Sequence, residues 1–402
     1  MDIIVLNDHG YISGGGAQVA ISSLKPLSDL GHNVTFIYGV GPIDPSIDQN
    51  TINAICLNSI DIGSAPPLKS FIFGLWNFSN QYKLKKILSK YDPTQTIIHL
   101  HGWTKSLTSS VIRSAINLDF KVIVTAHDYF TVCPNGGLFN FKKSVNCPIK
   151  PLSVKCILTN CDSRSYVVKI WRCFRQAVHN FYGYIPLGLY AIITVSPYSE
   201  NLLKNIIGNR INYIRINNPI KSIKVRPFDI AKSNNFTFIG RLSFEKGPHI
   251  FARAASIARV RSVFVGDGAL MHYMRTRFPK SIFLGWCTKG GIYNALKSTR
   301  ALVFPSLLHE TQGLVISEAA SMGVPSIVSD DCAGRDSIDD GVTGLLFKHG
   351  DIDDLANKIL LLADNPGYAE RLGQQAYKKY WEKPQDEISH AKNLLKCYYQ
   401  IL

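Results

Sequence analysis

The sequence has no long hydrophobic run and is short of acidic residues. Its longest uncharged stretch, residues 176–199, is interrupted by two proline and two glycine residues, so it cannot form an apolar membrane-spanning helix. Asp and Glu number 29 against 44 Lys and Arg, a formal net charge of +15. With 46% hydrophobic and 18% charged residues in 402, the composition excludes a disordered or fibrous chain. We therefore expect a folded protein of about two or three domains that favours anionic partners.

The first residues show no targeting segment. Residues 1–7 have no basic flank, and their apolar run ends after four residues, which is typical of a first β-strand and not of a signal peptide. We expect a cytoplasmic protein, which could also lie peripherally on the inner face of the cytoplasmic membrane. In that reducing compartment the nine cysteines are not expected to form disulfides.

Apolar runs rich in valine and isoleucine alternate with segments of helical periodicity. This alternation is typical of parallel sheets covered by helices on both faces, and it predicts an α/β protein. A polar segment, residues 221–235, separates two such series and indicates a domain boundary. The predicted strands are residues 3–6, 34–38, 97–100, 122–125 and 191–195 in the first series, and 236–239, 263–265, 301–304 and 326–329 in the second.

Two motifs suit a phosphorylated ligand. Gly14, Gly15 and Gly16 follow the first strand, and glycines at a helix start let backbone N–H groups approach an anion, although this motif alone fits a plain tight turn equally well. Arg241 and Lys246 lie five residues apart after the first strand of the second series. Such a pair can neutralise a diphosphate, but exposed cations are common on any surface.

Two carboxylates follow in the second series. Glu310 lies in a predicted strand-to-helix loop and Glu318 in the helix after it. At about 1.5 Å rise per residue they are roughly 10 Å apart, too far for an acid and a base acting on one bond but suited to holding two ends of one ligand by its hydroxyls. Between them, Gly313 lets the backbone at the helix start approach a phosphate, with the helix dipole assisting.

In this order, the motifs of residues 236–365 resemble the retaining family 4 glycosyltransferases, of the type that makes bacterial surface polysaccharides. The resemblance implies the GT-B fold, in which two Rossmann-like doubly wound domains face a central cleft. The matching residues are Gly240-Arg241, Lys246-Gly247, Glu310 and Glu318 around Gly313, Gly323-Val324-Pro325, and Gly341-Val342-Thr343-Gly344-Leu345-Leu346.

The resemblance also implies domain bounds. Residues 1–217 would form the acceptor-side domain, with a cysteine-rich insertion at about 128–180. Residues 218–382 would form the nucleotide-sugar-binding domain. Residues 383–402 would form a helix that packs back on the first domain.

For the second domain the resemblance implies a donor site. Arg241 and Lys246 would bind the donor diphosphate, and Glu310 would contact the hydroxyls of the donor sugar. Backbone atoms at Gly313 and Leu314 would help to hold the sugar and the phosphate. Glu318, also in this domain, would bind the ribose.

For the first domain the resemblance implies fewer contacts. Gly15 and Gly16 correspond to the glycine loop near the donor phosphates and the acceptor. His127 corresponds to a strand-end histidine beside the reacting carbon of the sugar. Without the resemblance, His127 would be interpreted as a satisfied buried histidine, which is the commoner case.

The implied activity is a metal-independent hexosyl transfer with retention, from a nucleotide-diphosphate sugar to a glycan or a polyprenyl-linked acceptor, in the synthesis of O-antigen, capsule or exopolysaccharide. Fixed cations and helix dipoles can stabilise the leaving diphosphate, so no catalytic cofactor is expected. A sugar-nucleotide epimerase or a glycan phosphorylase on the same fold is the alternative. A nucleic-acid-binding protein fits less well, because the basic residues are dispersed and no motif of that class is present.

Cysteines crowd one part of the insertion. Cys133, Cys147, Cys156 and Cys161 supply four thiols, which could hold a structural zinc ion or an iron-sulfur cluster. The usual Cys-x-x-Cys pairing is missing, so buried free thiols that pack as small apolar side chains are the alternative.

A basic and aromatic segment follows the cysteines. Arg164, Lys169, Arg172 and Arg175 alternate with aliphatic and aromatic residues. The segment could lie on an anionic membrane, or it could cover the domain core while its cations face water. We expect its apolar side chains to face the core and its cations to face outward, toward a membrane.

Overall fold

The computed structural model describes residues 1–402, which divide into two compact units. None of the helices combines the length and the apolar character needed to cross a bilayer. Unit 1 comprises Met1–Leu138, Pro148–Pro219 and Asp386–Leu402, and unit 2 comprises Phe139–Cys147 and Ile220–Gln385. Two of these boundaries lie two and three residues beyond the expected domain ends at 217 and 382.

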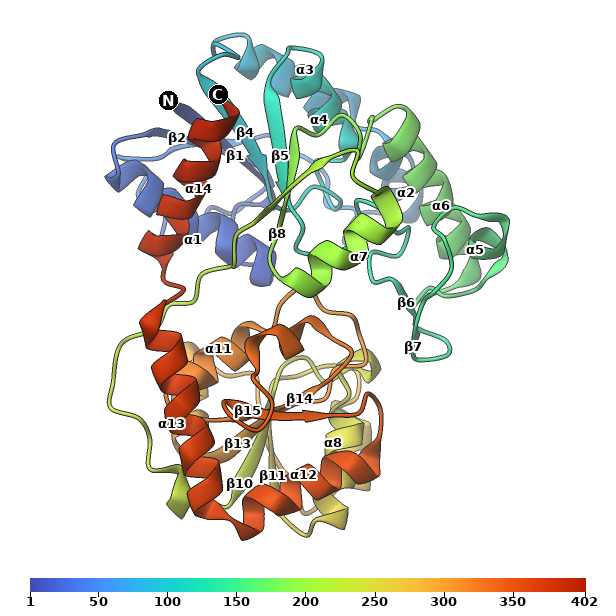
Figure 1. Ribbon diagram of the computed structural model, residues 1–402. Coiled ribbons are helices and arrows are strands. Elements are labelled where there is room, and N and C mark those ends of the chain that lie inside the picture. Colours follow the sequence, from blue (N-terminus) through green and yellow to red (C-terminus); the bar gives the residue numbers. More distant parts are fainter. The chain divides into compact units, whose positions relative to one another are not determined.

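Unit 1 is built on a seven-stranded parallel sheet in the order β3-β2-β1-β4-β5-β8-β9 (Figure 1). All five strands predicted for the first series are confirmed. The two edge strands, β3 and β9, were missed, because each has only four residues and none of them is fully buried. The strands are β1 (Asp2–His9), β2 (Asn33–Val40), β3 (Asn53–Cys56), β4 (Thr96–Leu100), β5 (Lys121–Thr125), β8 (Ala191–Thr194) and β9 (Asn212–Arg215).

Helices cover this sheet, and the last of them comes from the C-terminal end of the chain. That helix, α14, lies against α1 within unit 1 and buries Leu394 and Tyr398 in a shared apolar cluster (Figure 1). The helices of unit 1 are α1 (Gly15–Asp29), α2 (Pro67–Leu75), α3 (Phe78–Leu88), α4 (Ser109–Ile116), α5 (Val154–Leu158), α6 (Tyr166–Phe181), α7 (Pro197–Ile207) and α14 (Glu387–Ile401).

Unit 2 has a six-stranded parallel sheet in the order β12-β11-β10-β13-β14-β15. The four strands predicted for the second series are confirmed, whereas β12 and β15 were missed. The strands are β10 (Asn235–Ile239), β11 (Arg261–Val265), β12 (Ile282–Gly285), β13 (Thr299–Phe304), β14 (Ser326–Ser329) and β15 (Gly344–Phe347).

The helices of unit 2 follow the strands in alternation, as expected for a doubly wound sheet. The α-helices are α8 (Pro248–Ile257), α9 (Met271–Arg277), α10 (Lys289–Lys297), α11 (Leu314–Ser321), α12 (Ile352–Asp364) and α13 (Pro366–Glu382). The short 3₁₀ turns are η1 (Ile230–Lys232), η2 (Phe244–Lys246) and η3 (Ala333–Ser337).

A small hairpin departs from the expected domain assignment. Strands β6 (Phe139–Asn140) and β7 (Val145–Asn146) lie inside the stretch that we assigned to the first domain, but they belong to unit 2. Phe139 is buried in the core of unit 2, and the Asn146 side chain donates a hydrogen bond to Asp331 at 3.0 Å. Burial of the apolar Phe139 ring thus attaches the hairpin to unit 2.

Helix α6 reverses the orientation expected for the basic and aromatic segment. Lys169 is 0% exposed and Arg175 is buried, whereas Val167 is 79% exposed and Phe174 is also exposed. Each buried cation has a partner: Lys169 Nζ donates to Cys156 Sγ at 3.4 Å, and the Arg175 guanidinium lies over two aromatic rings. The prediction that the apolar side chains face the core and the cations face outward was therefore wrong for Val167 and Phe174 and for Lys169 and Arg175, whereas Arg164 is exposed as predicted.

We predict that α14 stabilises unit 1 through one buried hydrogen bond. The Tyr398 hydroxyl lies 2.7 Å from His99 Nδ1, and both side chains are fully enclosed. Tyr398→Phe leaves that nitrogen without a partner, so we expect about 1–3 kcal/mol less free energy of unfolding in urea titrations. Tyr399→Phe is the control, because Tyr399 is exposed and its contact with His32 is 3.4 Å long. Equal stability of the two variants would contradict the prediction.

Candidate functional site

In unit 2, two polar loops meet at the carboxyl ends of neighbouring strands. Lys246 ends η2, after β10, and Glu310 lies between β13 and α11. Lys246 Nζ donates to both carboxylate oxygens of Glu310, at 2.6 and 2.8 Å. The Ser306 hydroxyl donates to Glu310 Oε1 at 2.7 Å. The structure therefore brings together two residues that are 64 positions apart in the chain.

Arg241 lies on the same loop as Lys246 but remains open. Its Nη2 donates to Glu245 Oε1 at 3.2 Å, and its side chain is 66% exposed. The backbone carbonyl of Glu245 accepts from Leu307 N and Leu308 N at 2.9 and 3.1 Å, which ties this loop to the one that carries Glu310. A guanidinium held at one side and open at the other can receive an anionic ligand.

Each of the two loops contains a residue with a positive φ angle, a conformation that favours glycine. Gly247 has φ 69°, and a Cβ there would collide with the carbonyl of Pro305. Glu310 has φ 42°, which is uncommon for a residue with a side chain. Local strain of this kind is retained where the surrounding contacts fix it, as the Lys246 and Ser306 contacts do here.

Helix α11 begins next to this cluster with uncapped amide groups. Gly313 is its N-cap and contributes no side-chain hydrogen bond, and Ile316 N donates to the Gly313 carbonyl at 3.0 Å. The amides of the first turn before Ile316 can therefore bind a ligand. Glu318 lies one turn further along the helix. Burial raises the pKa of Glu318, and the ammonium group of Lys289 opposes this rise.

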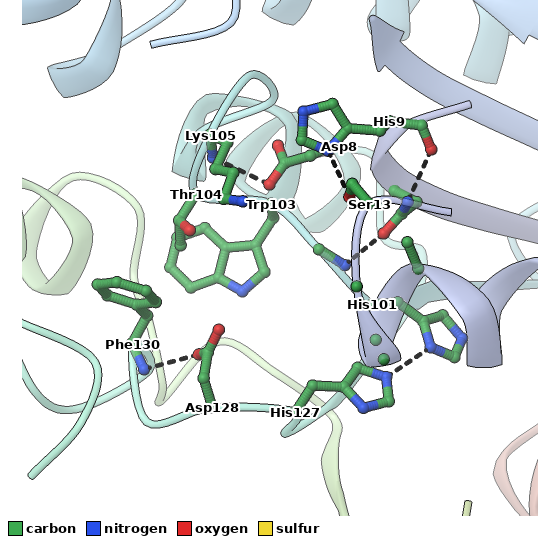
Figure 2. A pocket seen from close by; sticks show the side chains of 16 residues that line it. Asp8, His9, Ser13, His101, Trp103, Thr104, Lys105, His127, Asp128 and Phe130 are labelled. Carbon is green, nitrogen blue, oxygen red and sulfur yellow. Dashed lines mark hydrogen bonds between the residues drawn. The ribbon is translucent and has the colours of Figure 1, made fainter. Parts of the chain in front are cut away.

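In unit 1, a pocket of about 200 Å³ lies at the carboxyl ends of β1, β4 and β5 (Figure 2). These strands are neighbours in the sheet, and the first turn of α1 closes one side of the pocket. Open parallel sheets bind ligands at this edge. The lining residues are Asn7, Asp8, His9, Ser13, Gly14, Gly15, Gly16, Ala17, His101, Gly102, Trp103, Thr104, Lys105, His127, Asp128 and Phe130.

His127 is paired with a second histidine in this pocket. Its Nε2 lies 2.9 Å from His101 Nδ1, and the two rings are stacked (Figure 2). Burial, followed by the charge of His390, lowers the pKa of His127 to about 3, so the imidazole is neutral near pH 7. A Cβ at Gly16 would lie 3.0 Å from the His127 ring, so this glycine is what lets α1 come so close.

Asp128 is the main site residue that the sequence analysis missed. Its side chain is open to solvent in the pocket, and Figure 2 shows its carboxylate directed toward Trp103. Its Oδ1 accepts from Phe130 N at 2.9 Å. Although the side chain is accessible at the pocket surface, the protein atoms crowded around it remove part of its hydration, and this desolvation raises the pKa of Asp128 to about 6. Its position at a strand end, directly after His127, was the available signal.

Asp8 and His9 were also missed; they follow the first predicted strand, residues 3–6, and end the observed strand β1. Asp8 accepts backbone hydrogen bonds at 2.8–2.9 Å from Lys105, Ser106 and Leu107, and so fixes the loop after β4. His9 Nε2 lies 3.2 Å from Asp61 Oδ2. The sequence signal for these two residues was a run of polar residues directly after an apolar strand.

The cysteines do not assemble as a metal site. Cys147 belongs to unit 2, whereas Cys133, Cys156 and Cys161 belong to unit 1 and are buried. No group of three or more His, Cys, Asp or Glu side chains could hold a metal ion. The Asn135 amide lies between Cys133 and Cys161, with contacts of 3.1 and 3.4 Å to the two sulfurs. The geometry therefore does not support the predicted zinc or iron-sulfur site.

Comparison with known proteins identifies the second unit. Residues 221–379 match the family described as Glycosyl transferases group 1. These residues form a glycosyltransferase group 1 domain. This domain contains Arg241, Lys246, Glu310 and Glu318.

Curated relatives align with part of the chain. One is the UDP-Gal:alpha-D-GlcNAc-diphosphoundecaprenol alpha-1,3-galactosyltransferase of Escherichia coli, 33% identical over 32% of this chain and 36% of the relative. Another is O-antigen chain mannosyltransferase C of Escherichia coli, 26% identical over 42% of this chain and 46% of the relative. The chain spans 26–48% of the length of the first three curated relatives it matches.

Solved structures match over the full chain. Anabaena HepE in complex with UDP and glucose has a TM-score of 0.68 and 18% identity, covering 100% of both chains. The sucrose-phosphate synthase of Thermosynechococcus elongatus has a TM-score of 0.73 and 18% identity, covering 100% of this chain and 99% of the other. At this identity the likeness shows the fold alone, and it confirms the predicted α/β fold of GT-B type.

We predict that the glycine at 16 is required beside His127. In Gly16→Ala the new Cβ would press on the His127 ring at 3.0 Å. We expect Gly16→Ala to lower kcat/KM about tenfold by displacing the ring. Gly367→Ala is the matched control, because a Cβ at Gly367, in the first turn of α13, meets nothing within 4 Å, and its activity should stay near that of the wild type. Turnover of a nucleotide sugar measures both, and equal activity of the variants would contradict the assignment.

Proposed function

We propose that the protein is a retaining, metal-independent glycosyltransferase that moves a hexosyl group from a nucleotide-diphosphate sugar to a glycan or polyprenyl-linked acceptor. The observation that carries this proposal is the bidentate contact of Lys246 with Glu310 beside the open Arg241, inside the glycosyltransferase group 1 domain. Two cations and a carboxylate at one strand edge match the charges of a sugar diphosphate and the hydroxyls of its sugar.

On the donor side, the leaving group is a diphosphate whose charge increases as the bond to the sugar breaks. The Arg241 guanidinium and the Lys246 ammonium are fixed cations that can stabilise this charge, and the uncapped amides at the start of α11 add a helix-terminus site. In this proposal Glu310 accepts hydrogen bonds from the donor-sugar hydroxyls and Glu318 from the ribose. Each of these groups is present before the reaction starts, so little reorganisation is needed.

On the acceptor side, we assign the pocket of unit 1. The neutral imidazole of His127 can lie against a reacting sugar carbon without repelling a developing positive charge. The Asp128 carboxylate, below the ring of Trp103, can accept a hydrogen bond from an acceptor hydroxyl (Figure 2). In transfer with retention, the acceptor proton passes to the departing donor phosphate, so Asp128 serves to position the acceptor.

Support for the acceptor class comes from relatives. The Escherichia coli galactosyltransferase is named for a diphosphoundecaprenol-linked acceptor, and the mannosyltransferase is named for the O-antigen chain. We propose a related acceptor and a role in the synthesis of O-antigen, capsule or exopolysaccharide. Such an acceptor would be met at the inner face of the cytoplasmic membrane.

The first test removes one donor-site cation. Lys246→Met keeps the length of the side chain but removes its charge and leaves the Glu310 carboxylate without its ammonium partner. We expect kcat/KM for the nucleotide sugar to fall about 100-fold or more, since fixed cations stabilise the leaving diphosphate. Turnover is measured with a panel of UDP-, GDP- and ADP-sugars, which also identifies the donor.

The control for this test is Lys379→Met. Lys379 also contacts a carboxylate, Asp339, at 2.7 Å, but both side chains are well exposed. Loss of an exposed pair has little effect, so activity should stay within about twofold of the wild type. Full donor turnover by Lys246→Met would refute the assigned donor site.

The second test uses pH. Because the pKa of Asp128 is raised to about 6, its carboxylate is lost as the pH falls through that value. We expect the KM for the acceptor to rise below pH 6 while the KM for the donor changes less. Asp128→Asn should remove this pH dependence and give a high acceptor KM throughout, whereas Asp29→Asn, on the exposed end of α1, should keep the wild-type profile. An unchanged profile in Asp128→Asn would exclude this role.

A further inference from the structure

Helix α6 exposes apolar side chains to solvent and buries cationic ones, although charged side chains are better suited to contact with water. Val167, Ile170 and Phe174 are exposed, whereas Lys169 is enclosed. A helix that only covered a domain core would have the opposite orientation, because burying an ammonium group is costly. This arrangement indicates that the outward face of α6 meets an apolar environment.

Helix α2 presents a second apolar surface beside it (Figure 1). Leu68, Phe71 and Ile72 are exposed, and Gly74 is the one buried residue of the helix. The two helices meet where Trp171 Nε1 donates to the carbonyl of Phe71 at 3.3 Å. A short helix that buries almost none of its apolar side chains gains little stability from them within unit 1.

Together the two helices enclose a hollow of about 820 Å³ whose walls are mainly apolar. Trp171 and Ile62 contribute to its lining. We name the surrounding surface the α2–α6 face. It consists of Leu68, Phe71, Ile72, Val167, Ile170 and Phe174.

The fully exposed charges around the α2–α6 face have one sign, and Asp61, which precedes the lining residue Ile62, is half-buried and lies 3.2 Å from His9 Nε2. No acidic residue occurs between Asp61 and Asp92. Between Asp128 and Glu200 there is a single acidic residue, Asp162, which is buried and paired with Arg172 at 2.9 Å. The exposed charged residues next to the face are Lys69, Lys155 and Arg164.

We propose that the α2–α6 face docks on the surface of an anionic phospholipid bilayer. Its apolar side chains would enter the boundary between headgroups and acyl chains, and the cations would contact the lipid phosphates. A contiguous apolar patch on a folded protein marks an interaction site, and a rim whose fully exposed charges are all positive complements an anionic membrane. The inference rests on the proposed function only in that a lipid-linked acceptor would be met at such a surface.

The test is sedimentation of the full-length protein with vesicles. We expect binding to vesicles of phosphatidylcholine mixed with phosphatidylglycerol, and weaker binding to phosphatidylcholine alone. The double variant Ile72→Glu with Val167→Glu should lower the partition coefficient about tenfold or more, because it removes apolar contact and adds negative charge. Both positions are exposed, so the variant should fold like the wild type, which circular dichroism verifies.

The matched control introduces two glutamates at exposed apolar positions that do not belong to the α2–α6 face. Ile257→Glu with Ile223→Glu replaces two isoleucines that are 53% and 77% exposed, against 55% and 79% for Ile72 and Val167. This control should bind vesicles like the wild type. Equal vesicle binding by the two double variants, or no binding of the wild type to anionic vesicles, would overturn the proposal. It would also be overturned if the wild type sedimented without vesicles as a dimer that Ile72→Glu with Val167→Glu dissociated.

The outcome is independent of the proposed function. Vesicle binding is measured without any sugar, and donor turnover is measured in solution with a short water-soluble acceptor. If the double variant loses vesicle binding but keeps donor turnover, both proposals hold. If vesicle binding behaves as expected but no nucleotide sugar is turned over, the glycosyltransferase assignment fails while the docking face stands.

Discussion

Burial of the parallel strands on both faces is the constraint on which the rest of this structure depends. Strands such as β1 and β10 are enclosed by helices, so their interiors hold mainly apolar side chains, and a polar residue there, such as Thr237, has a buried hydrogen-bond partner. Polar residues that can meet a ligand therefore gather where the strands end. Asp8, His127 and Asp128 gather at such an edge in unit 1, and Lys246 and Glu310 do so in unit 2. Both candidate sites follow from this one rule.

A second constraint is that a buried charge needs a partner. In unit 2 the partly buried Lys246 and Glu310 satisfy each other, and a ligand that competes for these groups meets charges already held in place. In unit 1 the same requirement explains the orientation of α6. Lys169 donates to the Cys156 thiol and the Arg175 guanidinium lies over two aromatic rings. Because these buried cations have partners, the helix can expose its apolar side chains. The orientation of one helix thus connects the interior of unit 1 with the surface proposed to meet a membrane.

Much of the fold could be predicted from the sequence because its signals are local. Apolar runs identified nine strands, and the glycines at 14–16 indicated the start of α1. Strands β3, β9, β12 and β15 and the two-residue strands β6 and β7 were missed, since short strands give weak periodicity. In the donor site, the family resemblance named Arg241, Lys246 and Glu310, but the spacing alone could not show that the lysine and the glutamate are in contact.

The sequence by itself determined the α/β class, the order of the strands along the chain and the residues that end them, because periodicity and chain order are properties of the sequence. Only the tertiary structure decided which distant residues meet. It joined Lys246 to Glu310, assigned residues 139–147 to unit 2, and enclosed Lys169 while exposing Val167. The physical reason is that a side chain's orientation depends on which partners can satisfy it, and those partners come from elements far apart in the chain.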